Sequence, residues 1–422
     1  MFPIALLAIL LTLLPCLLVL HAGHNYPLLY RFDRALTNDR DEVPRRYELP
    51  RYYELSDGQV DTSVRWPGWD GWYFFMLPDD RSIPTKMIRG SLMTGLYGLQ
   101  GIDDYEEILH RLSTFEAAEH LCLVPTDERV GGRTERENYL SQHYLPKKTD
   151  LQMDHRELDV EVTGPGVYGD EERERWGRIR GRWPDYEMEL VNPEAGIRVE
   201  LEYSGDHLVW WADLPGLFTY FSAFGSFEGS ITYAHGTTVD DPHEIEGESE
   251  TYELSGRGCF EHGFGRRPFN FDAPSLPLRL LGQVIPTSVI NYHYEVFIGD
   301  DGAEGGFMKA GGLGVDMRNH GGIYLDGRYL EVYSIRVDYL EDPPPEKVDR
   351  HCHGEPQVQF YRRWRVRAMT DEGKLEYVAL RDGPPAAIAP HMMYYYYTFE
   401  GSLAGEPISG RGYGEYVDFG PV

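Results

Sequence analysis

The sequence predicts an all-β protein built from two diverged copies of one barrel-like unit, preceded by a single apolar N-terminal segment. Two observations predict this fold: short motifs that recur in the same order in both halves, and alternation of apolar and polar residues between them. The 422 residues are too many for one typical hydrophobic core and sufficient for two. With 41% hydrophobic residues, the composition is that of a folded protein.

An internal repeat runs through the chain and has three anchors. Tyr73 begins the run Tyr-Phe-Phe-Met-Leu-Pro-Asp-Asp, and Tyr294, 221 residues later, begins the similar run Tyr-Glu-Val-Phe-Ile-Gly-Asp-Asp. The other two anchors are matching segments, 227–231 with 399–403 and 255–258 with 409–412. Because self-similarity that keeps its order is typical of a duplicated structural unit, we predict two related domains.

The first copy should carry an insertion, because the offset between matching anchors falls from 221 to 172 and then to 154 residues along the chain. We place this insertion near residues 101–180. Within it, Asp104-x-x-Glu107 resembles a capping box and precedes apolar residues at helical spacing. Pro125 is a suitable end for this helix. The sequence therefore predicts a helical insertion in the first domain.

Strands are predicted between the anchors. Residues 197–203 place Ile, Val, Leu and Tyr at every second position, between Arg and Glu, which is typical of a strand with one wet face. Residues 363–368 alternate Arg with Trp, Val and Ala in the same way. Short polar turns such as Asp326-Gly327 separate these strands. Many antiparallel strands in two copies favour barrels or strongly curved sheets, which remove exposed edges.

The N-terminal segment is the candidate membrane anchor. Residues 2–20 are apolar apart from Thr12 and are long enough to span a bilayer. They lack a basic start, and His21-Ala22-Gly23 is a poor cleavage site, so we favour an uncleaved single-pass anchor over the signal peptide of a secreted protein. Arginines between residues 31 and 46 favour a body on the cytoplasmic side. The predicted divisions are 1–23 (anchor or signal segment), 24–60 (linker), 61–270 (first domain) and 271–422 (second domain).

Composition excludes some partners and cofactors. The formal charge of −29 and pI of about 4.9 repel phosphate backbones, so we expect no nucleic acid partner. The four cysteines have unrelated spacings and indicate neither a disulfide framework nor a zinc site. His351-Cys352-His353 is the one ligand-like cluster and offers too few ligands, so no metal site is predicted. No Gly-x-Ser-x-Gly nucleophile motif and no His-Glu-x-x-His zinc motif occurs.

Three short stretches resemble the superfamily of carotenoid hydratases and AttH-like proteins, which includes relatives of tocopherol cyclase and of some Diels–Alder cyclases. They are the opening Gly-Trp-Tyr-Phe at 71–74, the Gly-x-Gly-x-x-Glu-His-x-Phe-Gly stretch at 256–265, and the closing Gly-x-Gly-Tyr-x-Glu strand at 410–415. The resemblance implies two tandem lipocalin-like β-barrel domains. Two departures stand out, because Glu261 replaces the family's aspartate and Phe264 replaces its tryptophan.

Glu261 and His262 are the best candidate catalytic pair. Adjacent residues of a strand face opposite sides, so only one of them should enter a regular barrel interior. In an apolar cavity, desolvation would raise the pKa of Glu261 and keep it protonated near neutral pH, as needed for protonating an alkene. The alternative is that both residues hold a turn by hydrogen bonds, and Glu415, at the matching place in the second copy, favours this structural role.

Aromatic residues are the candidate ligand contacts, because lipocalin-like barrels line their cavities with inward side chains. Core packing is the alternative for each of them. In the run 394–397 of four tyrosines, alternate side chains must face opposite sides. The predicted ligand-binding residues are Trp72, Tyr73, Trp210, Trp211, Tyr294, Tyr413 and Glu415.

Three functions remain open at this stage. The first is a membrane-associated hydratase, cyclase or isomerase that acts on an apolar isoprenoid-like or polyketide-like small molecule without a cofactor. The second is a non-catalytic lipid-binding or carrier protein with the same fold. The third is a structural protein whose barrels are packed solid. Replacing Glu261 with Gln separates the first two, because the amide cannot donate the acidic proton.

Overall fold

The structure is a computed structural model, and it is described for residues 45, 48, 54–56, 59–61, 68–94, 118–125, 138–139, 143–144, 150–153, 158–165, 174–192, 197–214, 218–234, 249–266, 291–312, 315–341, 349–350, 360–389 and 392–417. Every element with assigned bounds in these ranges is a β-strand. None of the described residues forms a helix long and apolar enough to cross a membrane. The predicted anchor at 2–20 lies outside the described residues.

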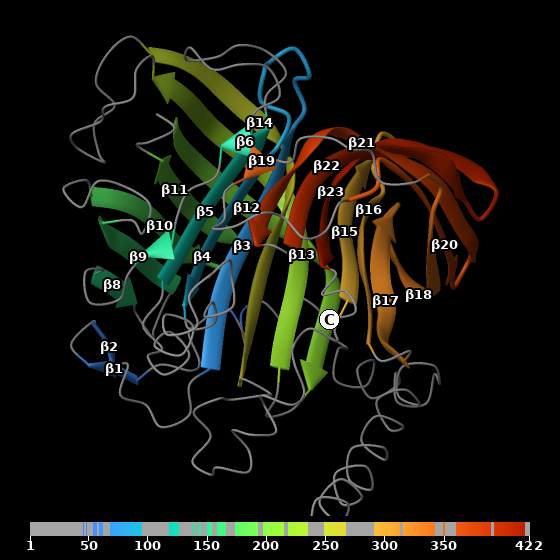
Figure 1. Ribbon diagram of the computed structural model, residues 1–422, viewed down its shortest axis with the longest axis horizontal. Coiled ribbons are helices and arrows are strands. Elements are labelled where there is room, and N and C mark those ends of the chain that lie inside the picture. The colour runs from blue at the N-terminus through green and yellow to red at the C-terminus, as the bar shows by residue number, and fades with distance from the viewer. Residues whose placement is uncertain are drawn as a thin grey trace, which may run out of the picture.

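The strands form two sheets, which lie side by side in Figure 1, the first in blue to green on the left and the second in orange to red on the right. The first sheet contains β1 (Glu54–Ser56), β2 (Gln59–Asp61), β3 (Gly68–Pro78), β4 (Ile88–Thr94), β5 (Ala118–Pro125), β6 (Asn138–Tyr139), β7 (His143–Tyr144), β8 (Asp150–Met153), β9 (Leu158–Pro165), β10 (Glu174–Arg182), β11 (Asp185–Asn192), β12 (Ile197–Leu214), β13 (Phe218–Ala234) and β14 (Ser249–Arg266). The second contains β15 (Asn291–Gly299), β16 (Glu304–Gly312), β17 (Val315–Leu325), β18 (Arg328–Tyr339), β19 (Asp349–Arg350), β20 (Arg363–Thr370), β21 (Gly373–Ala389), β22 (Met392–Leu403) and β23 (Glu406–Val417).

The second sheet closes into a barrel. Its order runs β21-β20-β18-β17-β16-β15-β23-β22, and β22 pairs again with β21. All of these pairings are antiparallel, as predicted; the short β19 adds to β21 in parallel. The core of this unit fills the barrel with aromatic side chains, including Trp364, Tyr377, Tyr395 and Phe399.

The first sheet follows the order β1-β2-β8-β9-β10-β11-β12-β13-β14-β3-β4-β5-β6, with β7 beside β5. Its curled face buries a second core that includes Phe74, Ile179, Leu190 and Phe260. Part of the predicted insertion belongs to this sheet. Residues 118–125 form β5, so the expectation that a helix ends at Pro125 is wrong; the segment around Asp104 and Glu107 lies outside the described residues.

The repeat is confirmed in the strand pairing. The anchors lie on β3, β13 and β14 in the first unit and on β15, β22 and β23 in the second, and both units pair these strands in the same order. The repeated glycines explain part of the matching sequence. A Cβ atom on Gly229 would lie 2.0 Å from the carbonyl oxygen of Glu200, and one on Gly401 would lie 2.1 Å from that of Glu376. Neighbouring strands approach too closely there for any side chain.

Alternation in the predicted strands is also confirmed. Val199, Leu201 and Tyr203 are buried in the first core, whereas Glu200 and Glu202 are exposed. The turn at Asp326-Gly327 joins β17 to β18 and has positive φ angles of 51° and 73°. Such angles are characteristic of tight hairpin turns, which favour the Asp-Gly pair.

Candidate active site at the interface of the two units

A third group of buried side chains lies between the two units. Strands of the repeat face each other there: β3, β13 and β14 from the first unit, and β15, β22 and β23 from the second (Figure 1). The apolar members of this group are Tyr73, Phe75, Leu77, Met87, Val209, Phe224, Cys259, Tyr294, Val296, Tyr394, Tyr396 and Tyr413. The period of two in each strand produces this layer, because residues that face away from a barrel core face the other unit instead.

Glu261 lies in this layer and is completely buried. On the sheet it is flanked by Ser222 of β13 and Tyr73 of β3. The hydroxyl of Ser222 donates to Oε1 over 2.5 Å, and the hydroxyls of Tyr220 and Tyr294 also donate to the carboxylate. Because Tyr294 belongs to β15, the second unit completes the surroundings of an acid that the first unit carries.

Burial raises the pKa of Glu261 to about 7. Hydrogen bonds from Ser222, Tyr220 and Tyr294 act in the opposite direction, and the negative charge of Glu415 adds to the rise. A carboxylic acid with such a pKa is largely protonated at slightly acidic pH and can both lose and regain a proton near neutrality, which suits a general acid.

Glu415 of β23 occupies the matching position and has different neighbours. The guanidinium of Arg89 lies 3.5 Å from Oε1 of Glu415, and Arg89 is itself completely buried. The hydroxyl of Tyr413 donates to Oε1 over 2.7 Å, and that of Tyr292 donates to Oε2 over 3.2 Å. The two carboxyl groups of the interface therefore have unlike surroundings: three hydroxyls and the thiol of Cys259 for Glu261, and hydroxyls with a cation for Glu415.

Aromatic rings surround Arg89 and line the same layer. Nε of Arg89 donates to the hydroxyl of Tyr413 over 3.1 Å, and Nη2 donates to that of Tyr394 over 2.8 Å. The guanidinium carbon also lies 4.1 Å from the ring centre of Tyr394, and Phe75 stacks on Tyr413 with ring centres 4.2 Å apart. Such a layer offers π-faces to a developing positive charge.

The structure brings together five of the predicted site residues, Glu261, Tyr73, Tyr294, Tyr413 and Glu415, in the interface. His262 and Trp72 lie on the opposite face, inside the first unit, where their rings stack 4.7 Å apart. Nε1 of Trp72 donates to the backbone oxygen of Glu48. As the alternation predicts, the two neighbouring residues face opposite sides: His262 is the one inside the first unit, and Glu261 faces the interface, so their side chains do not meet. Trp210 and Trp211 belong to β12, and their side chains lie outside what the structure describes.

Sequence reasoning missed Arg89, Ser222 and Tyr220. Arg89 lies opposite Phe75, and the equivalent position opposite Val296 in the second unit is Gly306, so the buried arginine occurs in one copy only. The tyrosine run followed the predicted alternation. Tyr394 and Tyr396 face the interface, whereas Tyr395 and Tyr397 face the core of the second barrel.

The arginine of the repeated Ser-Gly-Arg-Gly motif crosses the interface in both copies. Arg257 of the first unit donates to Glu304 of the second from Nε over 2.6 Å and from Nη2 over 3.0 Å. Arg411 of the second unit donates to the backbone oxygen of Leu77 over 3.3 Å. Burial alone would raise the pKa of Glu304, but hydrogen bonds from His207 and Arg257 outweigh burial and lower it. We call Arg257 and Arg411 the clamp arginines.

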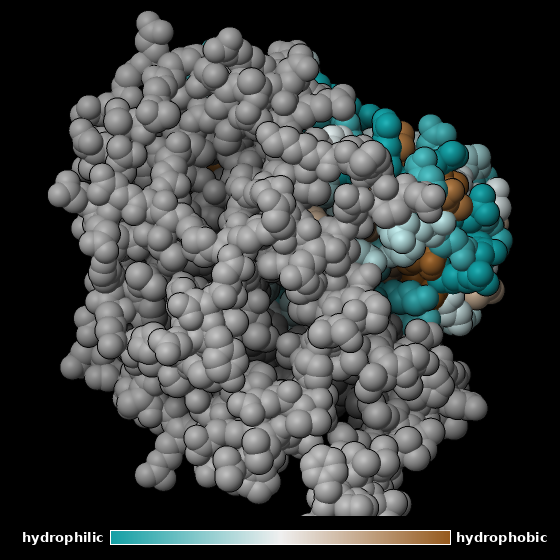
Figure 2. All heavy atoms as spheres, in the orientation of Figure 1, coloured by the Kyte–Doolittle hydropathy of each residue, from teal (hydrophilic) through white to brown (hydrophobic). Residues whose placement is uncertain are grey.

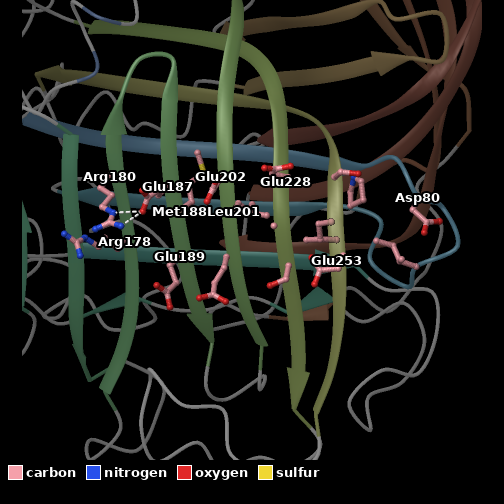
Figure 3. A pocket seen from close by; sticks show the side chains of 17 residues that line it. Asp80, Arg178, Arg180, Glu187, Met188, Glu189, Leu201, Glu202, Glu228 and Glu253 are labelled. Carbon is pink, nitrogen blue, oxygen red and sulfur yellow. Dashed lines mark hydrogen bonds and ion pairs between the residues drawn. The ribbon is translucent and has the colours of Figure 1, made fainter.

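Open cavities lie at other places. One of about 680 Å³ lies at the edge of the interface near the clamp arginines, and one of about 800 Å³ lies on the first unit. Figure 3 shows the second of these, where Arg178 and Arg180 lie among Glu187, Glu189 and other glutamates of β10 to β14. Within the described ranges no group of His, Cys, Asp and Glu could hold a metal ion; His351-Cys352-His353 lies outside them.

Comparisons with known proteins support the fold. The sequence matches no protein-family model and no curated protein sequence. Among solved structures, CghA with Sch210972 is similar with a TM-score of 0.50 and 11% identity, over 89% of this chain and 97% of that one. Kievitone hydratase from Nectria haematococca has a TM-score of 0.46 and 10% identity, over 88% of this chain and 98% of that one. A protein from Nitrosomonas europaea assigned as AttH has a TM-score of 0.45 and 9% identity, over 88% of this chain and 99% of that one. The resemblance seen in the motifs thus holds for the tandem-barrel fold.

Proposed function

We propose that the protein is a membrane-associated acid catalyst that hydrates, cyclises or isomerises an apolar, isoprenoid-like or polyketide-like small molecule in the layer between its two units. The observation that carries this proposal is Glu261, a carboxylic acid without exposure to solvent, whose pKa is raised to about 7. CghA, which is similar in fold, was solved with the small molecule Sch210972, and the proposal assigns a small-molecule ligand to this chain as well.

The chemistry needs a proton donor and a site that tolerates positive charge. In a hydration, Glu261 transfers its proton to one carbon of an alkene, and the cation forms at the other carbon. Water adds to that carbon, and the proton that the added water loses returns to the Glu261 carboxylate. In a cyclisation, a second double bond replaces water as the nucleophile, and the cation that this attack leaves loses a neighbouring proton to the Glu261 carboxylate. The rings of Tyr73, Tyr294 and Tyr394 and the carboxylate of Glu415 supply stabilisation for the cation.

The hydroxyls around Glu261 have a second role in this mechanism. Tyr220, Ser222 and Tyr294 keep the acid in one orientation, so that it does not turn freely when a ligand enters. They also stabilise the carboxylate that remains after proton transfer. General acid catalysis of this kind contributes roughly 10²- to 10⁴-fold to a rate.

The test uses isotopes, because an incorporated label can be detected before the product is identified. The full chain is incubated with an apolar lipid extract in deuterium oxide, and small molecules are examined by mass spectrometry for incorporated deuterium or added water. We expect incorporation with the wild type and a loss of at least about 100-fold with Glu261→Gln. Glu295→Gln is the matched control: Glu295 is equally buried but lies inside the second barrel, bonded to His293 and Trp364.

Turnover that survives Glu261→Gln contradicts the acid role. Retention of an apolar molecule without any isotope incorporation by the wild type would instead favour the carrier function. Loss of activity in both glutamine variants would point to a general effect on folding, and thermal unfolding of each variant separates that case from a specific one.

A further inference from the structure

We infer that the outer face of β18, β20 and β21 in the second barrel is a docking surface for an anionic membrane. The face combines a row of arginines with exposed apolar side chains, in a chain whose formal net charge is −29. This surface is separate from the interface that holds Glu261, and the inference stands independently of the proposed reaction. We call it the basic face.

The arginine row comes from the alternation in β20. Trp364, Val366 and Ala368 are buried in the barrel core, so Arg363, Arg365 and Arg367 point outward at every second position. Neighbouring strands extend the charge. Arg367 pairs in register with Arg336 of β18, and Met369 pairs with Lys374 of β21.

Cations outnumber anions around the arginine row. Five side chains are cationic: Arg336, Arg363, Arg365, Arg367 and Lys374. Two carboxylates lie among them: Asp338, which binds Arg336 and Arg367, and Glu376, which binds Lys374 and Arg365. The turn end of the same strands adds one further cation and three carboxylates, which are Arg328, Glu331, Asp371 and Glu372. The six cations thus outnumber the five carboxylates, so the net charge of this face is positive, opposite in sign to that of the whole chain.

Apolar side chains complete the basic face. The large apolar residues that are exposed within the described ranges all lie on these strands or directly after β18: Leu380 at 43%, Met369 at 41%, Tyr333 at 38% and Leu340 at 37%. Tyr333 and Met369 are direct partners across two strands. Figure 2 shows the surface of the second unit on the right, mainly hydrophilic with separate hydrophobic patches.

The mixture favours a lipid surface over a protein partner. Protein interfaces usually have an apolar centre with a polar rim. Here apolar and cationic residues are interspersed, as they are in segments that lie at a membrane interface with apolar groups in the headgroup boundary and cations on the phosphates. The aliphatic parts of the arginines add to the apolar contact.

The net charge of the chain does not oppose this docking at physiological salt. Fields of exposed charges fall off over about 8 Å at that ionic strength, so a surface responds to the charges beside it. Each cation near an anionic bilayer adds to the attraction. An apolar ligand that partitions into the bilayer would then be close to the protein.

The test compares two sets of three arginines. Arg178, Arg180 and Arg182 on β10 have the same spacing as the basic-face arginines. Arg178 and Arg180 lie among carboxylates (Figure 3), and Arg182 pairs in register with Asp185. The full chain is mixed with vesicles of phosphatidylcholine alone or with added phosphatidylserine, and flotation gives a partition coefficient for each. The measured quantity is the coefficient with phosphatidylserine divided by the coefficient without it. We expect R363Q/R365Q/R367Q to lower this ratio at least about tenfold and R178Q/R180Q/R182Q to leave it unchanged.

Any membrane binding by the apolar residues 2–20 is the same in all variants, so the comparison between the two triple variants is decisive. The inference is overturned if the ratio of partition coefficients changes less than twofold in R363Q/R365Q/R367Q, or changes equally in both triple variants. A face that binds an acidic protein instead of a membrane would give the first of these results. Because substituting three arginines could affect folding, Met369→Gln with Leu380→Gln serves as a second variant. This variant should lower partition into both vesicle types. Unchanged partition would overturn the inference that Met369 and Leu380 contact the membrane.

Discussion

Glu261 and Glu415 stand at equivalent positions of a duplicated structure, and the side chains around them differ. Glu261 lies on β14, which pairs with β3, and Glu415 lies on β23, which pairs with the matching β15; each faces the other unit. Ser222 and Tyr73 flank the first, and Tyr394 and Tyr294 flank the second. The buried Arg89 forms an ion pair with Glu415, and strand pairing places Gly306 at the equivalent position of the second unit. The repeat thus contains two equivalent carboxyl groups, and Ser222 beside the first and Tyr394 and Arg89 beside the second make their surroundings unlike.

The largest effect is expected when the cation is removed. Arg89→Met leaves Glu415 without its counter-charge at the interface and should lower the free energy of unfolding by about 3 kcal/mol, since breaking a buried pair on one side is costly. Denaturant unfolding measures the loss. The double variant R89M/E415Q should recover part of it, whereas a double variant no more stable than R89M would contradict the pairing.

The pH dependence of stability should show the next effect, which comes from Glu261. The pKa of Glu261 is about 7 in the folded chain and 4.5 in its ordinary state, so the folded chain binds more protons between these values. Stability from this group is therefore greatest at low pH and falls as pH rises from about 4.5 to above 7, by about 3 kcal/mol in total. Unfolding curves of the wild type minus those of E261Q should show this slope.

Glu415→Gln sharpens the same measurement. The charge of Glu415 contributes to the raised pKa of Glu261, so its removal should lower that pKa and move the slope to lower pH. A slope that keeps its position in E415Q would mean that the two groups do not interact.

Substitution of equivalent glycines should lower the free energy of unfolding by the same amount in both units, whereas the two carboxyl groups should differ. A Cβ atom on Gly256 would lie 2.4 Å from the carbonyl oxygen of Leu77, and one on Gly410 would lie 2.2 Å from that of Ile298. Gly256→Ala and Gly410→Ala should each cost about 2 kcal/mol, because the strands must separate to admit the methyl group. Thermal or denaturant unfolding gives both values, and a large difference between them would show that the units tolerate change unequally.

The smallest effect concerns single hydroxyls. Tyr294→Phe removes one donor to Glu261 and should cost about 1 kcal/mol of stability while raising the pKa of Glu261 further, since that hydrogen bond lowers it. Tyr292→Phe is the matched control, because its hydroxyl donates to Glu415 instead. Infrared spectroscopy against pH follows the carboxyl band of Glu261. The pH at which this band is lost should rise in Tyr294→Phe and stay unchanged in Tyr292→Phe.

Much of the fold was predictable because strand alternation and turn residues are local. Residues 197–203, the turn at Asp326-Gly327 and the order of the repeat do not depend on distant contacts. The site was predictable only in part. Glu261 stood in a recognisable motif, but its partners come from strands whose outward faces are covered by the other unit. Sequence periodicity tells which residues share a face and cannot tell what covers that face, so Tyr220 and Arg89 were missed.

The clamp arginines make each half of the chain the binding partner of the other. Arg257 belongs to the first unit and binds the second, whereas Arg411 belongs to the second and binds the first. Two copies in a symmetric homodimer recognise each other in the same reciprocal way. If the chain were expressed as two polypeptides divided between β14 and β15, each would still carry the recognition residue for its mate. The covalent connection then raises the local concentration of two mutually complementary units, while the contacts between them supply the affinity.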